Sequence, residues 1–254
     1  MDRRDAERVS LRAPISGLAA GERNLEGAVA HYLGHVLRLR AGDAFVAFDP
    51  AGAVEVDAEV LRVDGDGVTV RFGPVREGAA RAQREIVWIQ GLAKGDKCDA
   101  VVRDATELGV TRVIVAATRR SVVRLGAARA AERQGRWARI AEQAARQCGR
   151  SDAPRIDAPC AWDEAIARVG DGGAVAAFVL WEQATQPLSC RLLPALARGA
   201  ALAFACGPEG GLDEAEVAEA GRRGWAVSSL GPLALRTETV AAAVLGAVRV
   251  WSGS

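Results

Sequence analysis

Lysine is almost missing from this chain of 254 residues, in which Lys94 and Lys97 are the only lysines against an arginine-rich background. Long apolar stretches are missing too. No run approaches the length of a membrane span, and the charged start MDRRDAERVS lacks the apolar segment of a signal peptide. From these absences we expect a cytoplasmic protein that neither enters a membrane nor is exported.

Cysteine pairs with metal or disulfide spacing are also lacking. The sequence has no CxxC motif, and the number of cysteines is odd: Cys98, Cys148, Cys160, Cys190 and Cys206. Most of them stand among apolar neighbours. We therefore expect buried, reduced thiols rather than a disulfide framework or a zinc ribbon.

Histidine occurs only twice, as His31 and His35. A spacing of four places both on one helix face, which is a metal-ligand spacing. No glutamate follows His31 as in HExxH, however, and no third ligand is evident. We expect no metal here and favour core-edge or RNA-contacting histidines.

Charge is balanced globally and uneven locally. The net charge of +1 gives no general attraction to nucleic acid. Between residues 112 and 150, however, ten arginines stand against two acids, Glu132 and Glu142, for a local charge of +8. This segment fits a local anionic partner, although a solvated arginine-rich helix explains the charge equally well.

The first third of the chain has the pattern of a small β-rich module. Strand-like runs occupy residues 44–52, 53–63 and 68–72, with the turn DGDG before the last run. Residues 24–43 predict a helix that stops at Gly42. We expect a β-barrel domain over residues 1–74, followed by a linker of glycine, arginine and alanine over residues 75–85.

From residue 86 to residue 254, apolar strands alternate with amphipathic helices. Near-continuous apolar strands in such an alternation predict an α/β domain whose parallel sheet is covered on both faces. In the long helix over 128–149, the pattern predicts an inner stripe of Trp137, Ile140, Ala141, Ala144 and Cys148. The other helices are expected over 96–110 (with Asp96 as N-cap), 161–169, 190–198, 213–223 and 237–251.

The stretch AFACGPEGGLDEAEV, residues 203–217, leaves an apolar strand through glycines and enters a helix at once. Asp213 and Glu216 form a predicted capping box, and Leu212 and Val217 are spaced as a hydrophobic staple. Ligands bind at such strand ends in open α/β sheets. No Gly-Lys-Ser/Thr and no GxGxxG is present, so a nucleotide P-loop and a nicotinamide site are poorly supported.

Two further strand ends carry polar residues. The segment LGPLALRTETVAAAVL, residues 230–245, leaves a strand through Gly-Pro and places Arg236, Thr237 and Glu238 at a helix start. The segment LWEQAT, residues 180–185, ends another strand with Glu182. Three strand ends in one sheet are able to line one pocket, although Thr237 as a simple N-cap is the plainer explanation.

Five segments together resemble the bacterial 16S ribosomal RNA uracil-N3 methyltransferase family, of the SPOUT class. They are, in order, RLRAGDAFVAFD, GLAKGDKCDAVVRDATELGV, RWARIAEQAARQCGR, GPEGGLDEAEV and LGPLALRTETVAAAVL. The resemblance covers nearly the whole chain. It implies an N-terminal PUA-like β-barrel, a C-terminal SPOUT domain with a trefoil knot, and a homodimer. The implied reaction methylates N3 of a uridine in the decoding region of 16S rRNA with S-adenosyl-L-methionine.

The resemblance also implies which residues act. Arg236 would stabilise the anion or orient the substrate, and Glu209 or Glu238 would take the N3 proton; if water takes that proton, positioning alone suffices. The implied cofactor-binding residues are Leu180, Trp181, Glu182, Gly207, Pro208, Glu209, Gly210, Gly211, Leu230, Gly231, Leu235, Arg236 and Thr237.

RNA contacts follow from the arginine cluster and from the resemblance. The uridine must be unpaired or flipped out, because N3 lies on its Watson–Crick edge. The segment before residue 75 is net acidic, at −3, so only one basic face is expected there. The expected RNA-binding residues are Arg12, Arg23, His35, Arg38, Arg119, Arg120, Arg124, Arg146 and Arg150.

Two other functions remain open from the sequence. Another SPOUT enzyme, acting on a ribose 2′-hydroxyl or on tRNA, would share the fold and cofactor. A non-catalytic RNA-binding assembly factor would share the fold and lack turnover. The intact GPEGG and LRTET segments argue against the second alternative.

Overall fold

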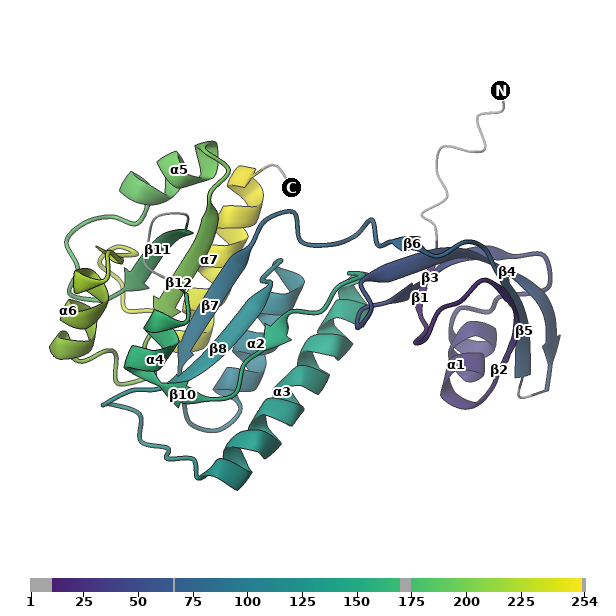
Figure 1. Ribbon diagram of the computed structural model, residues 1–254, viewed down its shortest axis with the longest axis horizontal. Coiled ribbons are helices and arrows are strands. Elements are labelled where there is room, and N and C mark those ends of the chain that lie inside the picture. Colours follow the sequence, from purple (N-terminus) through teal and green to yellow (C-terminus); the bar gives the residue numbers. More distant parts are fainter. Residues whose placement is uncertain (1–10, 66, 170–174, 253–254) are drawn as a thin grey trace. The chain divides into compact units, whose positions relative to one another are not determined.

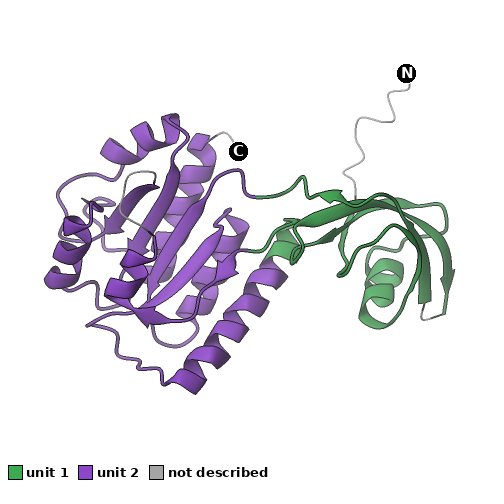
Figure 2. Ribbon diagram, in the orientation of Figure 1, with its two compact units in different colours: residues 1–81, 145–153 green, residues 82–144, 154–254 purple. Residues whose placement is uncertain are grey.

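The computed structural model describes residues 11–65, 67–169 and 175–252 (Figure 1). The chain forms two compact units, residues 1–81 with 145–153 and residues 82–144 with 154–254, coloured green and purple in Figure 2. The first boundary falls inside the expected linker over 75–85. The return of residues 145–153 to the first unit had no sequence signal.

The first unit is a mostly antiparallel sheet around its own core. Strands pair in the order β1-β3-β4-β5-β2, with β6 beside β4, and among the described strands of this unit only the β1–β3 pairing is parallel. In β4, Val56, Ala58 and Val60 are buried while Asp57 and Glu59 are exposed, as strand alternation requires. The strands are β1 (Arg12–Pro14), β2 (Gly21–Leu25), β3 (Ala44–Asp49), β4 (Val54–Asp64), β5 (Gly67–Phe72) and β6 (Arg76–Glu77).

The helix predicted over residues 24–43 is much shorter in the structure. Residues before it pair in β2, α1 spans Gly27–His31, and a π-helical turn continues over Tyr32–Val36. Arg38 then takes a left-handed backbone angle, with φ of 56°, which ends the helix before Gly42. The prediction was wrong at both ends because strand pairing and a left-handed arginine leave no hydrophobic signature.

The second unit contains a parallel sheet of seven strands, in the order β10-β8-β7-β12-β11-β13, with β9 beside β8. This confirms the parallel sheet expected from the apolar runs. In β7, Ile86 and Trp88 pack into one core and Val87 and Ile89 into the other, so both faces are buried. The strands are β7 (Ile86–Gly91), β8 (Arg112–Ala117), β9 (Arg155–Ile156), β10 (Cys160–Ala161), β11 (Val175–Leu180), β12 (Ala201–Cys206) and β13 (Ala226–Ser228).

Helices cover the two faces of this sheet. Residues of α2 (Lys97–Glu107), α3 (Ala127–Cys148), α5 (Ser189–Ala197) and α7 (Thr237–Ser252) pack into one core. Residues of α4 (Trp162–Ala167) and α6 (Glu214–Arg222) pack into the other. Each predicted helix of this unit exists, with ends that differ by a few residues.

Details of three helices test the sequence patterns. In α3, Trp137, Ala141 and Ala144 are buried as predicted, whereas Ile140 is half-buried and Cys148 is exposed. Asp96 occupies the N-cap of α2 but makes no side-chain capping bond, so that prediction was wrong in its chemistry. The Asp213–Glu216 capping box of α6 is confirmed.

Cysteine burial divides the five thiols, all of which are free. Burial raises the pKa of Cys98 to about 11 and that of Cys206 to about 12, so these thiols stay protonated at neutral pH. Cys160 is half-buried, and Cys148 and Cys190 are exposed, against our expectation of buried thiols.

In the described part of the chain, no helix has the length and apolar character to span a bilayer.

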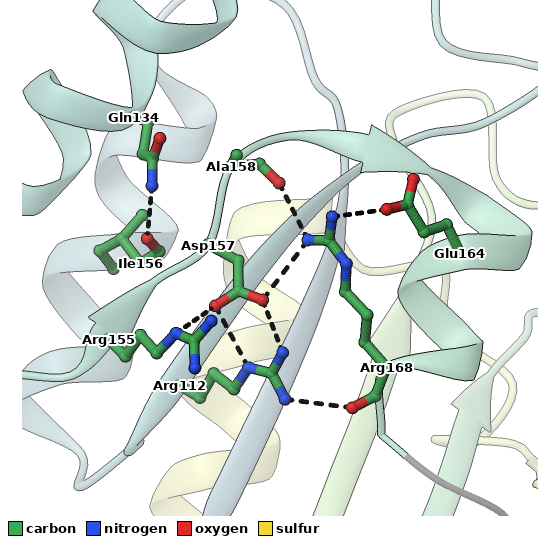
Figure 3. A network of polar contacts seen from close by, with 8 residues as sticks. All are labelled: Arg112, Gln134, Arg155, Ile156, Asp157, Ala158, Glu164 and Arg168. Atoms are coloured by element: carbon green, nitrogen blue, oxygen red, sulfur yellow. Dashed lines mark hydrogen bonds and ion pairs between the residues drawn. The ribbon is translucent and has the colours of Figure 1, made fainter.

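A buried carboxylate joins three segments of the second unit (Figure 3). Asp157, only 3% exposed, contacts Arg112 at 2.6 Å, Arg155 at 2.9 Å and Arg168 at 3.4 Å. Burial raises the pKa of Asp157, but Arg112 and the other two guanidinium groups outweigh it and hold the pKa below its usual value. The network fastens β8, the segment after β9 and the end of α4 to one another.

Candidate active site

One row of paired residues marks the carboxyl edge of the parallel sheet. Gln90 of β7 pairs with Cys206 of β12, Cys206 pairs with Leu180 of β11, and Leu180 pairs with Ser228 of β13. A cavity of about 720 Å³ opens beyond this row. Its walls are the segments that follow these strands and the start of α7, which is where ligands bind in open α/β sheets.

The cavity brings together the residues that the sequence placed there. All of the predicted cofactor-binding residues line it, and so does Glu238. Pro232, Leu233 and Ala234 also line the cavity and lie inside the predicted pocket loop from Leu230 to Thr237. Sequence reasoning missed three further lining residues: Lys97, Cys206 and Val240. Cys206 and Val240 lie close to predicted segments, whereas Lys97 comes from a fourth segment.

The glycines of GPEGG are required by packing. Gly211 has a φ of 72°, and a Cβ there would lie 2.6 Å from Oε1 of Glu182. A Cβ on Gly207 would lie 2.7 Å from the carbonyl carbon of Gly211, and one on Gly91 would lie 2.5 Å from Pro208. The glycines therefore do more than reverse the chain direction. They let the backbone of the turn pack closely against two neighbouring segments beside the cavity.

A buried hydrogen-bond network joins the ends of β7 and β12 to the start of α7. The Thr237 hydroxyl donates to the Gly207 carbonyl oxygen at 2.7 Å and accepts from Nε2 of Gln90 at 2.8 Å. Nε2 of Gln90 also reaches the carbonyl oxygens of Gly91 and Gly207, while its Oε1 accepts from the Trp88 indole. Thr237 therefore ties the start of α7 to the glycine turn instead of capping its own helix.

Glu209 is held as an ionised carboxylate at the cavity wall. Its Oε1 accepts from the Lys94 backbone N–H at 3.0 Å and lies 3.1 Å from Nζ of Lys97. Burial raises the pKa of Glu209, but backbone hydrogen bonds and Lys97 outweigh it and hold the pKa below its usual value. A carboxylate of lowered pKa is a poor proton acceptor, which weakens one of the two predicted assignments.

Two other lining residues carry polar atoms that need a partner. Oε2 of Glu238 and Nε1 of Trp181 are buried and make no hydrogen bond within the described residues. The Arg236 side chain is exposed and is likewise free of ion pairs there. Buried polar atoms without partners are rare in native proteins, so Glu238 and Trp181 are candidates for contact with a ligand.

Two protein-family models match this chain. The family model described as "RNA methyltransferase domain" matches residues 80–249, and the one described as "RNA methyltransferase PUA domain" matches residues 25–73. The chain belongs to the RNA methyltransferase family. The first match covers the second unit up to residue 249, including the cavity, and the second match covers most of the sheet of the first unit.

Individual relatives of this family agree over most of the chain. Ribosomal RNA small subunit methyltransferase E of Bacillus subtilis is 29% identical over 229 residues, covering 89% of this chain and 88% of the relative. The enzyme of the same name from Mycobacterium tuberculosis is 29% identical over 230 residues, covering 89% and 85%.

Solved structures of RNA methyltransferase relatives give the same picture. Ribosomal RNA small subunit methyltransferase E of Neisseria gonorrhoeae, bound to S-adenosyl methionine, matches with a TM-score of 0.77 and 25% identity over 95% of this chain and 97% of that one. A methyltransferase of Legionella pneumophila in complex with SAM matches with a TM-score of 0.76 and 26% identity over the same shares.

Arginines after β8 adjoin the glycine turn. Nη1 of Arg120 donates to the Gly210 carbonyl oxygen at 3.0 Å, and Nη1 of Arg119 lies 3.3 Å from Oδ1 of Asp213. Arg124 donates to the Thr118 carbonyl oxygen at 3.1 Å. The Arg119 side chain remains 67% exposed, so its charge is available at the rim.

Predicted RNA-binding residues of the first unit fall into two groups. Arg12 bonds Glu55 and Ser151 and lies over the Phe48 ring, and Arg150 is buried against Asp152. These two guanidinium groups are engaged inside the protein, which gives them a structural role. The exposed residues are Arg23, His35, Arg38 and Arg146, with the His35 ring stacked on His31 at 4.6 Å.

No third ligand accompanies these histidines. Across residues 11–65, 67–169 and 175–252, no three His, Cys, Asp or Glu side chains gather in a way that could hold a metal ion.

Proposed function

We propose that this protein uses S-adenosyl-L-methionine to methylate N3 of a uridine in the decoding region of 16S rRNA. The observation that carries the proposal is the single cavity that collects every predicted cofactor-binding residue at the carboxyl edge of the sheet. The names of the relatives, and the S-adenosyl methionine bound to the Neisseria enzyme, support the same assignment.

The residues present fit this cofactor. A volume of about 720 Å³ lies in the usual range for pockets that hold molecules of this size. Leu180, Leu230 and Leu235 offer apolar surface for an adenine ring, and the glycine turn leaves room for close backbone approach. The unpartnered Trp181 indole N–H and Glu238 carboxylate oxygen supply polar groups that the folded chain leaves unsatisfied.

The chemistry asked of the protein is positioning and charge stabilisation. S-adenosyl-L-methionine, when bound, supplies an electrophilic methyl group on a sulfonium sulfur. Arg236, exposed at the cavity, would stabilise negative charge on a uracil carbonyl oxygen. Glu238 is the better candidate for holding the N3 proton, because its buried oxygen lacks a partner whereas Glu209 is already charge-paired.

Substrate RNA would lie over the basic rim of the second unit. Arg119, Arg120 and Arg124 follow β8, and Arg120 bonds Gly210 in the turn that carries Glu209. They would hold phosphates on either side of an unpaired uridine. Arg23, His35, Arg38 and Arg146 would supply the contacts of the PUA-like barrel.

The trefoil knot and the homodimer are proposed from the resemblance, and one observation supports the homodimer. Leu233 is 78% exposed beside the cavity, and Leu230 and Leu235 are also exposed. Apolar side chains gathered on one exposed loop fit a two-fold interface next to each pocket.

The test uses small ribosomal subunits from cells that lack this protein. We expect purified protein and methyl-labelled S-adenosylmethionine to place label in 3-methyluridine, and Arg236→Ala to lower the rate at least about a hundredfold, the usual scale for losing a group that stabilises transition-state charge. Arg198→Ala, an exposed arginine after α5, is the matched control and should act like the wild type.

Other outcomes would assign the rival functions. Label in a 2′-O-methyl nucleoside, or in tRNA alone, would agree with the fold and would refute the proposed reaction. If the protein binds the cofactor but labels neither subunits, naked rRNA nor tRNA, the proposed substrate is wrong. Neither binding nor label would favour the assembly factor.

A further inference from the structure

The two lysines of the chain lie in one turn. Lys94 lies between β7 and α2, and Lys97 is the first residue of α2, although arginine supplies every other strongly cationic side chain. Arginine presents a wide planar fork, whereas lysine presents a compact ammonium with three rotatable donors. A chain that otherwise uses arginine has therefore kept the compact cation at one place, beside the cavity that Lys97 lines.

The position of Lys97 runs against helix electrostatics. It is the first residue of α2, and the N-cap residue Asp96 makes no side-chain hydrogen bond to the first turn. Helix N-termini carry partial positive charge, so a cation there is unfavourable without an anion nearby. Glu209 and Asp99 of the first turn supply such anions, and both the ammonium and the helix start favour a further carboxylate or phosphate at this wall.

Opposite charges stand side by side at this wall. Nζ of Lys97 lies 3.1 Å from Oε1 of Glu209, and the two side chains are 35% and 30% exposed. Glu209 is ionised, as its lowered pKa requires. The wall of the cavity therefore presents one positive and one negative group at adjacent points, both within reach of a ligand.

We propose that Lys97 and Glu209 bind the α-amino acid group of S-adenosylmethionine, Lys97 its carboxylate and Glu209 its ammonium. The inference rests on the proposed function and deepens it. An α-amino acid group is a zwitterion with opposite charges on one carbon, so adjacent protein charges of opposite sign match it at two points. Lys94 contributes its backbone N–H to Glu209, and its exposed side chain has no part in the pair.

Three ligands separate the two charges. S-adenosylmethionine carries the carboxylate, the ammonium and the sulfonium, decarboxylated S-adenosylmethionine lacks the carboxylate alone, and methylthioadenosine lacks all three charged groups. Each keeps the adenosine portion. Binding of each to the full-length protein is measured by calorimetry without RNA.

The expected pattern is specific to each variant. Lys97→Met should lower the affinity for S-adenosylmethionine about tenfold and leave the affinities for the other two ligands within about twofold of the wild type. Loss of one charge-assisted contact at a partly exposed site implies a change of this size. Lys97→Arg should recover part of that affinity. Glu209→Gln should weaken binding of both ligands that carry the ammonium and leave methylthioadenosine binding unchanged. It should weaken binding of S-adenosylhomocysteine equally, because that compound has the ammonium without the sulfonium charge. Lys94→Met is the matched control and should bind all three as the wild type does.

Two results would overturn this proposal alone. If Lys97→Met binds S-adenosylmethionine as tightly as the wild type, the pair is a rim salt bridge or an RNA contact. If the substitution lowers the affinity for all three ligands equally, Lys97 supports the structure of the pocket and does not bind the carboxylate. Failure of the wild type to bind any of the ligands would instead refute the proposed function itself.

Discussion

Replacing Thr237 by valine should destabilise the fold at the wall of the cavity. Valine keeps the shape of threonine and removes the hydroxyl that bonds the Gly207 carbonyl oxygen at 2.7 Å and Nε2 of Gln90 at 2.8 Å. Thr237 is 5% exposed and Gln90 1%, so water cannot easily replace the lost partner. Leaving buried polar groups short of a hydrogen bond costs about 1–3 kcal/mol. We expect the free energy of unfolding to fall by about 2 kcal/mol.

Tryptophan fluorescence during urea unfolding is a selective assay for this change. All six tryptophans lie in the second unit, so their emission reports the unit that holds the cavity. Thr237→Ser is the matched control, since it keeps both hydrogen bonds and loses one methyl group, worth about 0.8 kcal/mol. The reasoning is refuted if Thr237→Val is as stable as the wild type, or more stable than Thr237→Ser.

Two further predictions concern stability and cofactor binding. Asp157→Asn should lower the free energy of unfolding by about 3 kcal/mol at neutral pH, because three guanidinium groups lose their buried partner. The folded-state pKa of Asp157 is lowered, so its contribution is present above the unfolded-state pKa of about 3.9 and is lost as the pH falls through the folded-state value. Acid titration of stability should therefore be shallower in the variant, and equal slopes would contradict this origin. Gly211→Ala should weaken S-adenosylmethionine binding at least about tenfold in calorimetry, because a Cβ would meet Glu182 at 2.6 Å on a backbone with φ of 72°. Gly135→Ala, in open space on α3, is its control and should raise stability by about 0.5–1 kcal/mol with unchanged binding.

Local patterns in the sequence indicated the elements around the cavity, and the resemblance supplied the residues expected to line it. Buried strands, the Asp213–Glu216 capping box and the polar helix start at Arg236 each leave a signature within a few residues, and the structure confirms the elements that carry them. Their convergence followed from one rule of parallel sheets, that strand ends meet at one edge.

Contacts between distant segments had no such signature. Arg12 has the sequence profile of an exposed basic residue, yet its partners Glu55 and Ser151 are 43 and 139 positions away. Gln90 has the profile of an ordinary polar residue at a strand end, yet it bonds Thr237 across 147 positions. Periodicity reports which face a residue occupies and is silent about the partner that tertiary packing brings to it.

The sheet order explains why a fourth segment was missed and why it belongs to the site. Because β12 lies between β7 and β11, the paired row from Gln90 through Cys206 and Leu180 to Ser228 crosses four strands at one level. Three of those strands continue into the predicted pocket segments. The fourth, β7, continues into GLAKGDK, which has the pattern of a plain strand-to-helix connection. Since all four leave the same edge, the segment that carries Lys97 must reach the same cavity as the other three.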